Sequence, residues 1–238
     1  MLTRLTRSLP VRLIEAVTAR GRAHLLPSLP ASIAELMLRK PDASFVQIGA
    51  HDGASGDPLH AFVKAGRLRG LLIEAQPDVF ERLKKTYEHN SGLTLLNLVV
   101  SAGATGTVPF YRIKPEYHAQ VPGADQLSGL TPRVIQRGLR GRFPNIEMMI
   151  ETVELPAMPL MQLLGEHAAF DANILCIDAE GGDAAILASI DFTRFKPAII
   201  HYEWCHLPLA EHARTLRMLV TNGYAVARTG NEVLAVVR

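Results

Sequence analysis

The sequence predicts an α/β fold: a doubly wound, mostly parallel sheet of seven strands, preceded by a helical arm. Short apolar segments alternate with helical patterns from residue 45 onward, an order typical of strand–helix–strand units. Three of these segments, Phe45–Gly49, Gly70–Glu74 and Asn173–Asp178, end in glycine or a carboxylate. The carboxyl ends of parallel strands meet at one edge of a sheet, where ligands bind in this class of fold. We therefore expect a ligand site at that edge.

The first half of the sheet domain alternates strands with two helices. The segment Pro77–Asn90 places Val79, Leu83 and Tyr87 on one face, which is the period of an amphipathic helix. Pro58 suits the first turn of a shorter helix. The expected strands are Phe45–Gly49, Leu71–Glu74, Leu93–Ser101 and an added Val108–Ile113, and the expected helices are Asp57–Gly66 and Pro77–Asn90.

The second half repeats the alternation and closes with a hairpin. The pair Gly230-Asn231 between two β-rich segments is a two-residue turn signal, so we expect an antiparallel final strand. The remaining expected elements are an extended Thr152–Leu155, helix Pro159–His167, strand Ile174–Asp178, helix Asp183–Ile190, strand Ala198–Glu203, helix Pro208–Asn222, and strands Gly223–Thr229 and Glu232–Val237.

Composition limits the class of protein. The chain has 238 residues, 48% of them hydrophobic, which suits one large core, so we expect a single domain over residues 41–238. Its formal net charge of +2 is too mild to indicate nucleic-acid binding. Two cysteines are too few for a disulfide framework and fit a reducing cytoplasm. No apolar run reaches the roughly 18 residues that a membrane span needs.

Residues 1–40 are expected to form a separate helical arm. This stretch carries many arginines against only two acids, Glu15 and Glu35. Arg12 and Glu15 interrupt its apolar run, so the uninterrupted core of a signal peptide is missing. A transit peptide and a membrane-surface helix are the alternatives. We expect an arm that packs on the sheet or on a second copy of the chain, with a helix at Ser32–Arg39.

The turn after the first strand indicates the kind of cofactor. A dinucleotide-binding turn needs the pattern G-x-G-x-x-G, but His51 and Ala54 stand where the second and third glycines belong. This disfavours a nicotinamide-dependent oxidoreductase. Asp52 within the turn would repel a pyrophosphate. Glu74 follows about 20 residues later, where a carboxylate accepts hydrogen bonds from ribose hydroxyls. A sugar-bearing, uncharged or cationic cofactor fits, and S-adenosylmethionine is the commonest of these.

Four motifs together resemble the FkbM family of class I S-adenosylmethionine-dependent methyltransferases. They are Val46–Pro58, Leu71–Phe80, Ile177–Asp183 and Pro197–Glu203, and the similarity covers about residues 44–226 in the family's order and spacing. The resemblance implies a seven-stranded sheet and O-methylation of a hydroxyl on a sugar, glycan or natural-product acceptor.

The resemblance also implies roles for single residues. Asp178 and Glu180 face the reacting centre. The sequence departs from the family at His51, Ala75 and Gly182. The family usually has Asn or another small residue at the first position, Pro at the second and an aromatic residue at the third. These departures put the acceptor in doubt more than the cofactor. The residues expected to bind the cofactor are Gly49, Ala50, His51, Asp52, Gly53, Glu74, Ala75, Gln76, Ser101 and Asp178.

An aliphatic hydroxyl is a poor nucleophile, so methyl transfer to it calls for a general base. Four candidates stand at the ends of neighbouring strands: Asp178, Glu180, His201 and Glu203. Either Glu180 or His201 could take the proton; His201 could equally be a core histidine. Mg²⁺ held by Asp178, Glu180 and Asp183 remains an alternative to a site without metal.

Residues 114–150 lack the strand–helix alternation. Four arginines, Arg133, Arg137, Arg140 and Arg142, lie at spacings that place several on one side of a helix beginning near Thr131. A long irregular segment within a domain is usually functional or mobile. The segment is either a solvated cover or an acceptor lid whose arginines bind an anionic or sugar-rich substrate.

A second class of function stays open alongside the enzyme. The chain could be a catalytically silent binding module that keeps the S-adenosylmethionine fold and acts through its basic arm. Binding of S-adenosylmethionine without turnover would distinguish it from a methyltransferase.

Overall fold

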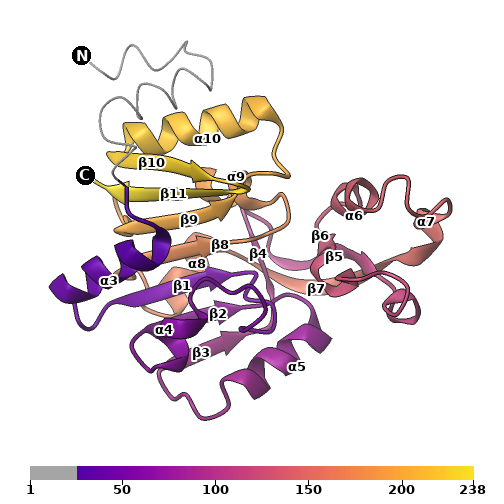
Figure 1. Cartoon of the computed structure of the whole chain (residues 1–238), viewed down its shortest axis with the longest axis horizontal. Helices are drawn as coiled ribbons and strands as arrows, with labels where there is room; N and C mark the ends of the chain where they lie inside the picture. The colour runs from indigo at the N-terminus through magenta and orange to yellow at the C-terminus, as the bar shows by residue number, and fades with distance from the viewer. Residues whose placement is uncertain (1–25) are drawn as a thin grey trace.

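The fold is described from a computed structural model, which covers residues 26–238 here (Figure 1). Most of the expected N-terminal arm therefore lies outside the described residues. Its last part is helix α3 (Leu29–Arg39), which contains the expected Ser32–Arg39 helix. The other α-helices are α4 (His60–Lys64), α5 (Pro77–Thr86), α6 (Arg133–Gly138), α7 (Ile146–Met149), α8 (Leu160–Glu166), α9 (Asp183–Ala188) and α10 (Leu209–Thr221). No helix between residues 26 and 238 is long and apolar enough to cross a membrane.

The main sheet has seven strands in the order β10-β11-β9-β8-β1-β2-β3. Strand β11 enters between β9 and β10 and runs antiparallel to both, because the hairpin turn sends the chain back along β10. The sheet is therefore a mixed one, where the sequence analysis described it as mostly parallel. The strands are β1 (Ser44–Ile48), β2 (Arg69–Ile73), β3 (Leu93–Leu96), β8 (Ile174–Ile177), β9 (Ile199–Glu203), β10 (Tyr224–Thr229) and β11 (Glu232–Val237).

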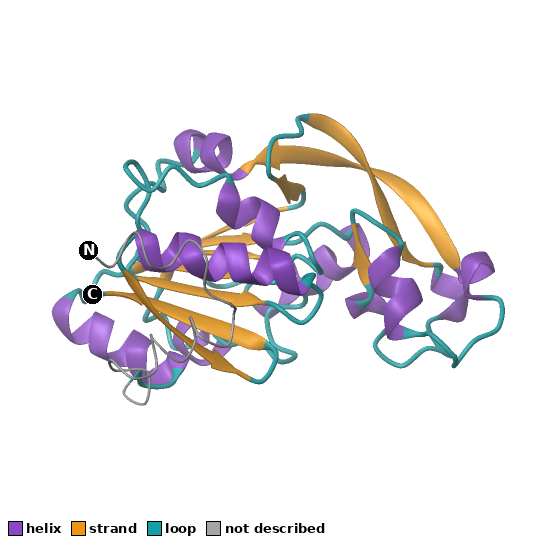
Figure 2. Ribbon diagram, turned by 90° about the horizontal axis from the view of Figure 1, so that it is seen from above, coloured by secondary structure: helices purple, strands orange, loops and turns teal. Residues whose placement is uncertain are grey.

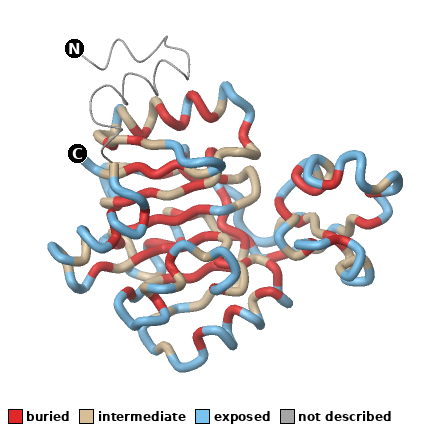
Figure 3. The backbone as a smooth tube through the Cα atoms, in the orientation of Figure 1, coloured by how far each residue is buried: buried red, intermediate tan, exposed pale blue. Residues whose placement is uncertain are grey.

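Helices cover both faces of the main sheet, as the view from above shows (Figure 2). On one face α8, α9 and α10 contribute to a core that includes Val46 and Leu175; on the other, α3, α4 and α5 pack over Phe45 and Ile174. All four residues of β8 are buried, so this central strand is apolar on both sides (Figure 3). The continuous apolar run of the strand follows from this double cover.

The helix after β2 shows how the sequence ends its elements. Pro77 stands in the first turn of α5, where its missing N–H is not needed, and Asp78 follows it there. Lys84 and Lys85 lie in the last turn, where cations interact favourably with the negative end of the helix dipole. The helix starts at Pro77, after the short turn that carries Glu74.

The expected third strand is two strands in different sheets. Strand β3 belongs to the main sheet, whereas β4 (Val99–Ser101) pairs with β7 (Ile150–Pro159). Between them the Asn97 side chain donates hydrogen bonds to the carbonyl oxygens of Glu74 and Ala75, at 2.8 and 2.9 Å. The prediction of one continuous strand was wrong because Asn97 ties the chain to the end of β2 and turns it away.

A four-stranded sheet, in the order β4-β7-β5-β6, completes the fold. Strands β5 (Gly106–Ile113) and β7 carry a lobe that projects beside the main sheet (Figure 1). The lobe contains the 3-10 turns η2 (Pro115–Tyr117) and η3 (Ala124–Gln126), strand β6 (Ser128–Gly129), α6 and α7. It has an apolar core of its own, which includes Ile113, Val121, Ile135, Leu139 and Met149. The elements of residues 114–150 are too short to show periodicity.

Candidate active site

A cavity of about 420 Å³ lies at the carboxyl edge of the main sheet. The turns after β1, β2 and β8 and the last residue of β9 line it, together with β4 and part of the lobe. Nine of the residues expected to form the site line this cavity: Gly49, His51, Glu74, Ala75, Gln76, Ser101, Asp178, Glu180 and Glu203.

The first turn is built on Gly49. Its backbone N–H and that of Ala50 both donate to the Ile73 carbonyl oxygen at 2.9 Å. A Cβ at position 49 would lie 1.8 Å from the Asp178 carbonyl oxygen, and φ there is +74°. Only glycine therefore lets the ends of β1 and β8 approach each other.

Glu74 is held by the backbone of two turns. Its Oε2 accepts a hydrogen bond from the His51 N–H at 2.9 Å, and its Oε1 accepts one from the Gln76 N–H at 2.8 Å. The carboxyl group is buried, which raises its pKa, while both hydrogen bonds oppose that rise. The Gln76 side chain donates to the Asp125 carbonyl oxygen at 2.7 Å and so fastens the lobe to this turn.

His51 has a positive φ of 48°, which is uncommon for a residue other than glycine. Its Nδ1 lies 3.4 Å from Asp52 Oδ1, and its Nε2 lies 3.4 Å from Asp125 Oδ2. Asp125 also pairs with Arg82 of α5. The imidazole is therefore placed between carboxylates from the turn and from the lobe.

The turn after β8 carries three acids with different surroundings. Asp183 is fully buried and accepts hydrogen bonds from the backbone N–H groups of Gly181, at 3.2 Å, and Ala179, at 3.5 Å. It therefore ties this turn to the start of α9. Glu180 has a positive φ of 48°, and its buried Oε2 makes no hydrogen bond. Strained backbone of this kind concentrates at functional sites.

Burial and mutual repulsion raise the pKa values of these acids. The pKa of Glu180 rises to about 9, because its carboxyl is desolvated and lies near Asp178, Glu203 and Asp183. Burial and the charge of Glu203 raise the pKa of Asp178 to about 6. Acids with such displaced pKa values in a cleft are candidates for proton transfer.

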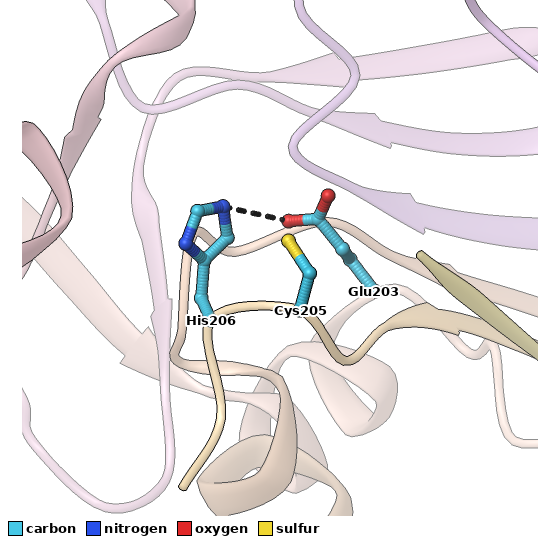
Figure 4. A group of neighbouring side chains, drawn as sticks. All are labelled: Glu203, Cys205 and His206. Atoms are coloured by element: carbon cyan, nitrogen blue, oxygen red, sulfur yellow. Dashed lines mark ion pairs between the residues drawn. The ribbon is translucent and has the colours of Figure 1, made fainter. Parts of the chain in front are cut away.

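His206 completes this cluster, and the sequence analysis did not select it. Its Nε2 lies 3.2 Å from Glu203 Oε2 and 3.3 Å from Glu180 Oε2. Figure 4 shows the imidazole and the Glu203 carboxylate pointing toward one another. The hydrogen bond to Glu203 raises the pKa of His206. The sequence signal that could have found it is a histidine three residues beyond a strand that ends in glutamate.

Four expected site residues do not line the cavity. Ala50 packs in the core and Gly53 lies against Tyr87, while Asp52 caps its own turn by accepting hydrogen bonds from the Ala54 and Ser55 N–H groups. His201 lies one strand repeat behind Glu203, with its Nε2 3.8 Å from Glu232 Oε2. Burial lowers the pKa of His201 to about 4, so its imidazole is neutral at pH 7.

A second cavity, of about 970 Å³, opens next to the first. Its walls come from α6 and α7 of the lobe, the turn after β8, and the start of α10. The two cavities share Leu130, Glu180 and Gly182. Glu180 therefore stands at the junction between them.

The family model described as "Methyltransferase FkbM domain" matches residues 47–226. The chain belongs to the FkbM methyltransferase family. The match begins in β1 and ends in β10, so it spans the carboxyl edge and the lobe. A comparison with curated proteins finds no match.

Solved structures with similar backbones include the methyltransferase FkbM from Methylobacillus flagellatus, at 13% identity and a TM-score of 0.49. The similarity covers 82% of this chain, which spans 44% of that protein's chain. Another is the precorrin-6y C5,15-methyltransferase from Geobacter metallireducens, at 14% identity and a TM-score of 0.41, with 87% of this chain and 84% of that one covered.

Membership of the FkbM family, a class I methyltransferase family, implies S-adenosylmethionine as methyl donor, and the first cavity fits this group. Its volume lies within the roughly 300–1,000 Å³ of small-molecule sites. Glu74 presents a buried carboxylate at the end of β2, where a ribose is bound in such sheets. Val99, Val100 and Phe110 give the cavity an apolar wall that suits an adenine ring.

One group of side chains in the described part of this FkbM-family chain could hold a metal ion. Ligand atoms of Glu203, Cys205 and His206 all lie within 4.8 Å of one another (Figure 4). Asp178, Glu180 and Asp183, the alternative Mg²⁺ ligands of the sequence analysis, form no such group among residues 26–238. Asp183 is committed to backbone N–H groups instead.

Proposed function

We propose that the protein is an S-adenosylmethionine-dependent O-methyltransferase that acts on a hydroxyl of a sugar, glycan or natural product. The observation that carries the proposal is the position of Glu180. Its buried Oε2, which makes no hydrogen bond, stands where a cavity suited to the donor meets a larger cavity with room for an acceptor. A proton acceptor belongs at that junction, because methyl transfer to a hydroxyl must remove its proton.

The donor would be held by the turns after β1, β2 and β8. Glu74 would bind the ribose hydroxyls through the lone pairs that its two backbone partners leave free. Gly49 lines the cavity and lets the ends of β1 and β8 approach each other beside it. The bound donor supplies a methyl group on a sulfonium, which an oxygen displaces in line. The protein's part is to hold the two reactants at attack distance, which can contribute several kcal/mol.

Glu180 would take the hydroxyl proton in this mechanism. With a pKa of about 9 it is protonated at neutral pH in the free protein. A sulfonium cation next to this acidic cluster favours the ionised form of each carboxyl group. Glu180 would therefore become a base when the donor site is filled. His206, between Glu180 and Glu203, would balance the charge.

His206 takes the place in this proposal that the sequence analysis considered for His201. His206 touches both carboxylates and lines the second cavity, whereas His201 faces Glu232. The two histidines form a matched pair for testing. His206→Asn should lower turnover with little change in donor affinity, and His201→Asn should leave both close to the wild type.

The test of the function combines binding with product analysis. Thermal shifts with S-adenosylmethionine, S-adenosylhomocysteine and NADH should show stabilisation by the first two alone. Incubation with S-adenosylmethionine and a panel of sugars and glycosides should give S-adenosylhomocysteine and an acceptor heavier by one methylene group. Base-stable methyl products would identify ethers, and base-labile ones would identify esters and contradict O-methylation of a hydroxyl.

Two other outcomes would contradict the proposal. Stabilisation by NADH alone would indicate a different cofactor class. Tight binding of S-adenosylmethionine with no product from any acceptor, in wild type and His206→Asn alike, would favour the catalytically silent binding module.

A further inference from the structure

The second cavity has an unusual set of charges. Three arginines from the lobe line it: Arg133 and Arg137 of α6 and Arg140 just beyond. No side chain of the three makes a hydrogen bond or an ion pair with any residue between 26 and 238. An arginine that lines a concave site without a protein partner has all its donors available to a ligand.

Two other arginines near the lobe, Arg112 and Arg82, do form ion pairs. Arg112 of β5 bonds Glu151 at 2.7 Å and Asp78 at 2.8 Å, and Arg82 pairs with Asp125. The fold thus provides carboxylate partners for arginines that join the lobe to the rest of the domain. Within residues 26–238, the three arginines of the second cavity have no carboxylate partner.

The acids in the same cavity do not neutralise these arginines. Glu147 and Glu211 also line it, but neither lies within ion-pair distance of an arginine in the described structure. Arg137, Glu180 and His206 all line this cavity. One acceptor molecule bound there can therefore reach both Arg137 and the proposed base, Glu180.

We propose that the second cavity binds the acceptor and that the acceptor carries an anionic group, a carboxylate or a phosphate. Arg133, Arg137 and Arg140 bind this group, and a hydroxyl elsewhere on the same molecule meets Glu180. The planar guanidinium fork matches the paired oxygens of a carboxylate or phosphate and forms two parallel hydrogen bonds with them. The inference rests on the proposed methyltransferase function, because it names the substrate class of that site.

The test uses three sugar probes that differ in one group. D-Glucuronate carries a carboxylate, D-glucose 6-phosphate carries a phosphate, and methyl glucoside is neutral. Each is titrated by saturation-transfer NMR against the full chain with S-adenosylhomocysteine present. At least one anionic probe should bind roughly 10-fold or more tightly than methyl glucoside, the gain expected for hydrogen bonds to a charged group.

Arginine variants assign the effect to the cavity. Arg137→Gln with Arg140→Gln should remove the preference for the anionic probe and leave S-adenosylhomocysteine affinity unchanged. Arg142→Gln is the matched control: it is exposed, lies in the same segment and does not line the cavity. It should keep the preference.

Several results would overturn the inference. They are equal binding of neutral and anionic probes, absence of signal from both anionic probes, no effect of the double variant, or an equal effect of Arg142→Gln. Failure of S-adenosylhomocysteine to bind the wild type would instead count against the proposed function. The same probe titration without S-adenosylhomocysteine would then judge the arginine cavity by itself.

Discussion

Two buried glutamates stand at the same edge of the main sheet, and the protein treats them differently. Glu74, after β2, has both carboxylate oxygens fixed by backbone N–H groups. Glu180, after β8, has a buried oxygen without a hydrogen bond and three acidic neighbours. The first arrangement holds a carboxyl group in one position, and the second leaves it free to exchange a proton. Under the proposed function, Glu74 serves binding and Glu180 serves chemistry at the same edge of the sheet.

The backbones of the two turns make the contrast sharper. His51 and Glu180 both have φ of 48°, so strained backbone is present on each side of the cavity. At His51 the strain aims an N–H at Glu74. At Glu180 it places a side chain at the junction of the two cavities. The same local conformation therefore serves a structural hydrogen bond in one turn and, in the other, the side chain that we propose as the base.

The largest expected effect is on turnover, when Glu180 is replaced. Glu180→Gln keeps the shape of the side chain and removes the proton acceptor, so kcat should fall by roughly 10²–10⁴-fold, the usual contribution of a general base. Affinity for S-adenosylhomocysteine should change little. Steady-state kinetics and calorimetry check the two parts. Glu154→Gln, at an exposed position of β7, is the control and should keep wild-type turnover. Turnover close to wild type in Glu180→Gln would remove Glu180 from the mechanism.

The next largest effect is on donor affinity, when Glu74 is replaced. Glu74→Gln replaces a charged acceptor of ribose hydrogen bonds, so affinity for S-adenosylmethionine should fall by about 1–3 kcal/mol. At saturating donor, kcat should recover much of the wild-type value. Calorimetry gives the affinity, and circular dichroism checks that loss of a backbone partner has not unfolded the turn. A folded variant with unchanged affinity would contradict the assignment.

The smallest effect is a pH dependence that sharpens the comparison. The pKa of Glu180 is about 9 in the free protein, and a bound cation lowers it. At a pH between the lowered pKa and 9, binding of S-adenosylmethionine should therefore release a proton. Affinity should then rise with pH below 9, by at most about tenfold per unit for one proton. S-Adenosylhomocysteine, which lacks the sulfonium charge, should show a weaker dependence.

Calorimetry in two buffers with different ionisation enthalpies measures the protons released. Glu180→Gln should reduce their number, and Glu74→Gln should keep it closer to wild type. An equal proton release for both nucleosides would show that the sulfonium charge is not its cause.

Much of the main sheet could be predicted from the sequence. Each strand there is a short apolar run bounded by a turn signal, as in β1 and β8, and the FkbM family followed from motifs at their ends. The second sheet was not predicted. The Asn97 hydrogen bonds that divide the third strand connect residues more than 20 positions apart, and no local pattern reveals them.

The position of the expected site residues around the cavity was predictable to a similar degree, while their roles stay a prediction. Residues placed by strand ends, such as Glu74 and Asp178, lie at the cavity as expected. His206 was missed because a loop, with no periodicity, folds it back onto Glu203. For His201 the strand pattern predicted the same face of β9 as Glu203. It did not predict how far His201 lies from the carboxyl edge of the sheet, and this distance keeps His201 out of the cavity.

The separate apolar core of the lobe has a consequence for how such a protein can change over time. Ile135 and Met149 belong to the apolar core of the lobe, whereas Val46 and Leu175 belong to the core of the main sheet. A substitution that reshapes α6 therefore disturbs only the smaller core. The proposed acceptor surface can change toward new molecules while the proposed donor-binding half keeps its sequence, so the lobe is the part where relatives of this chain should diverge first.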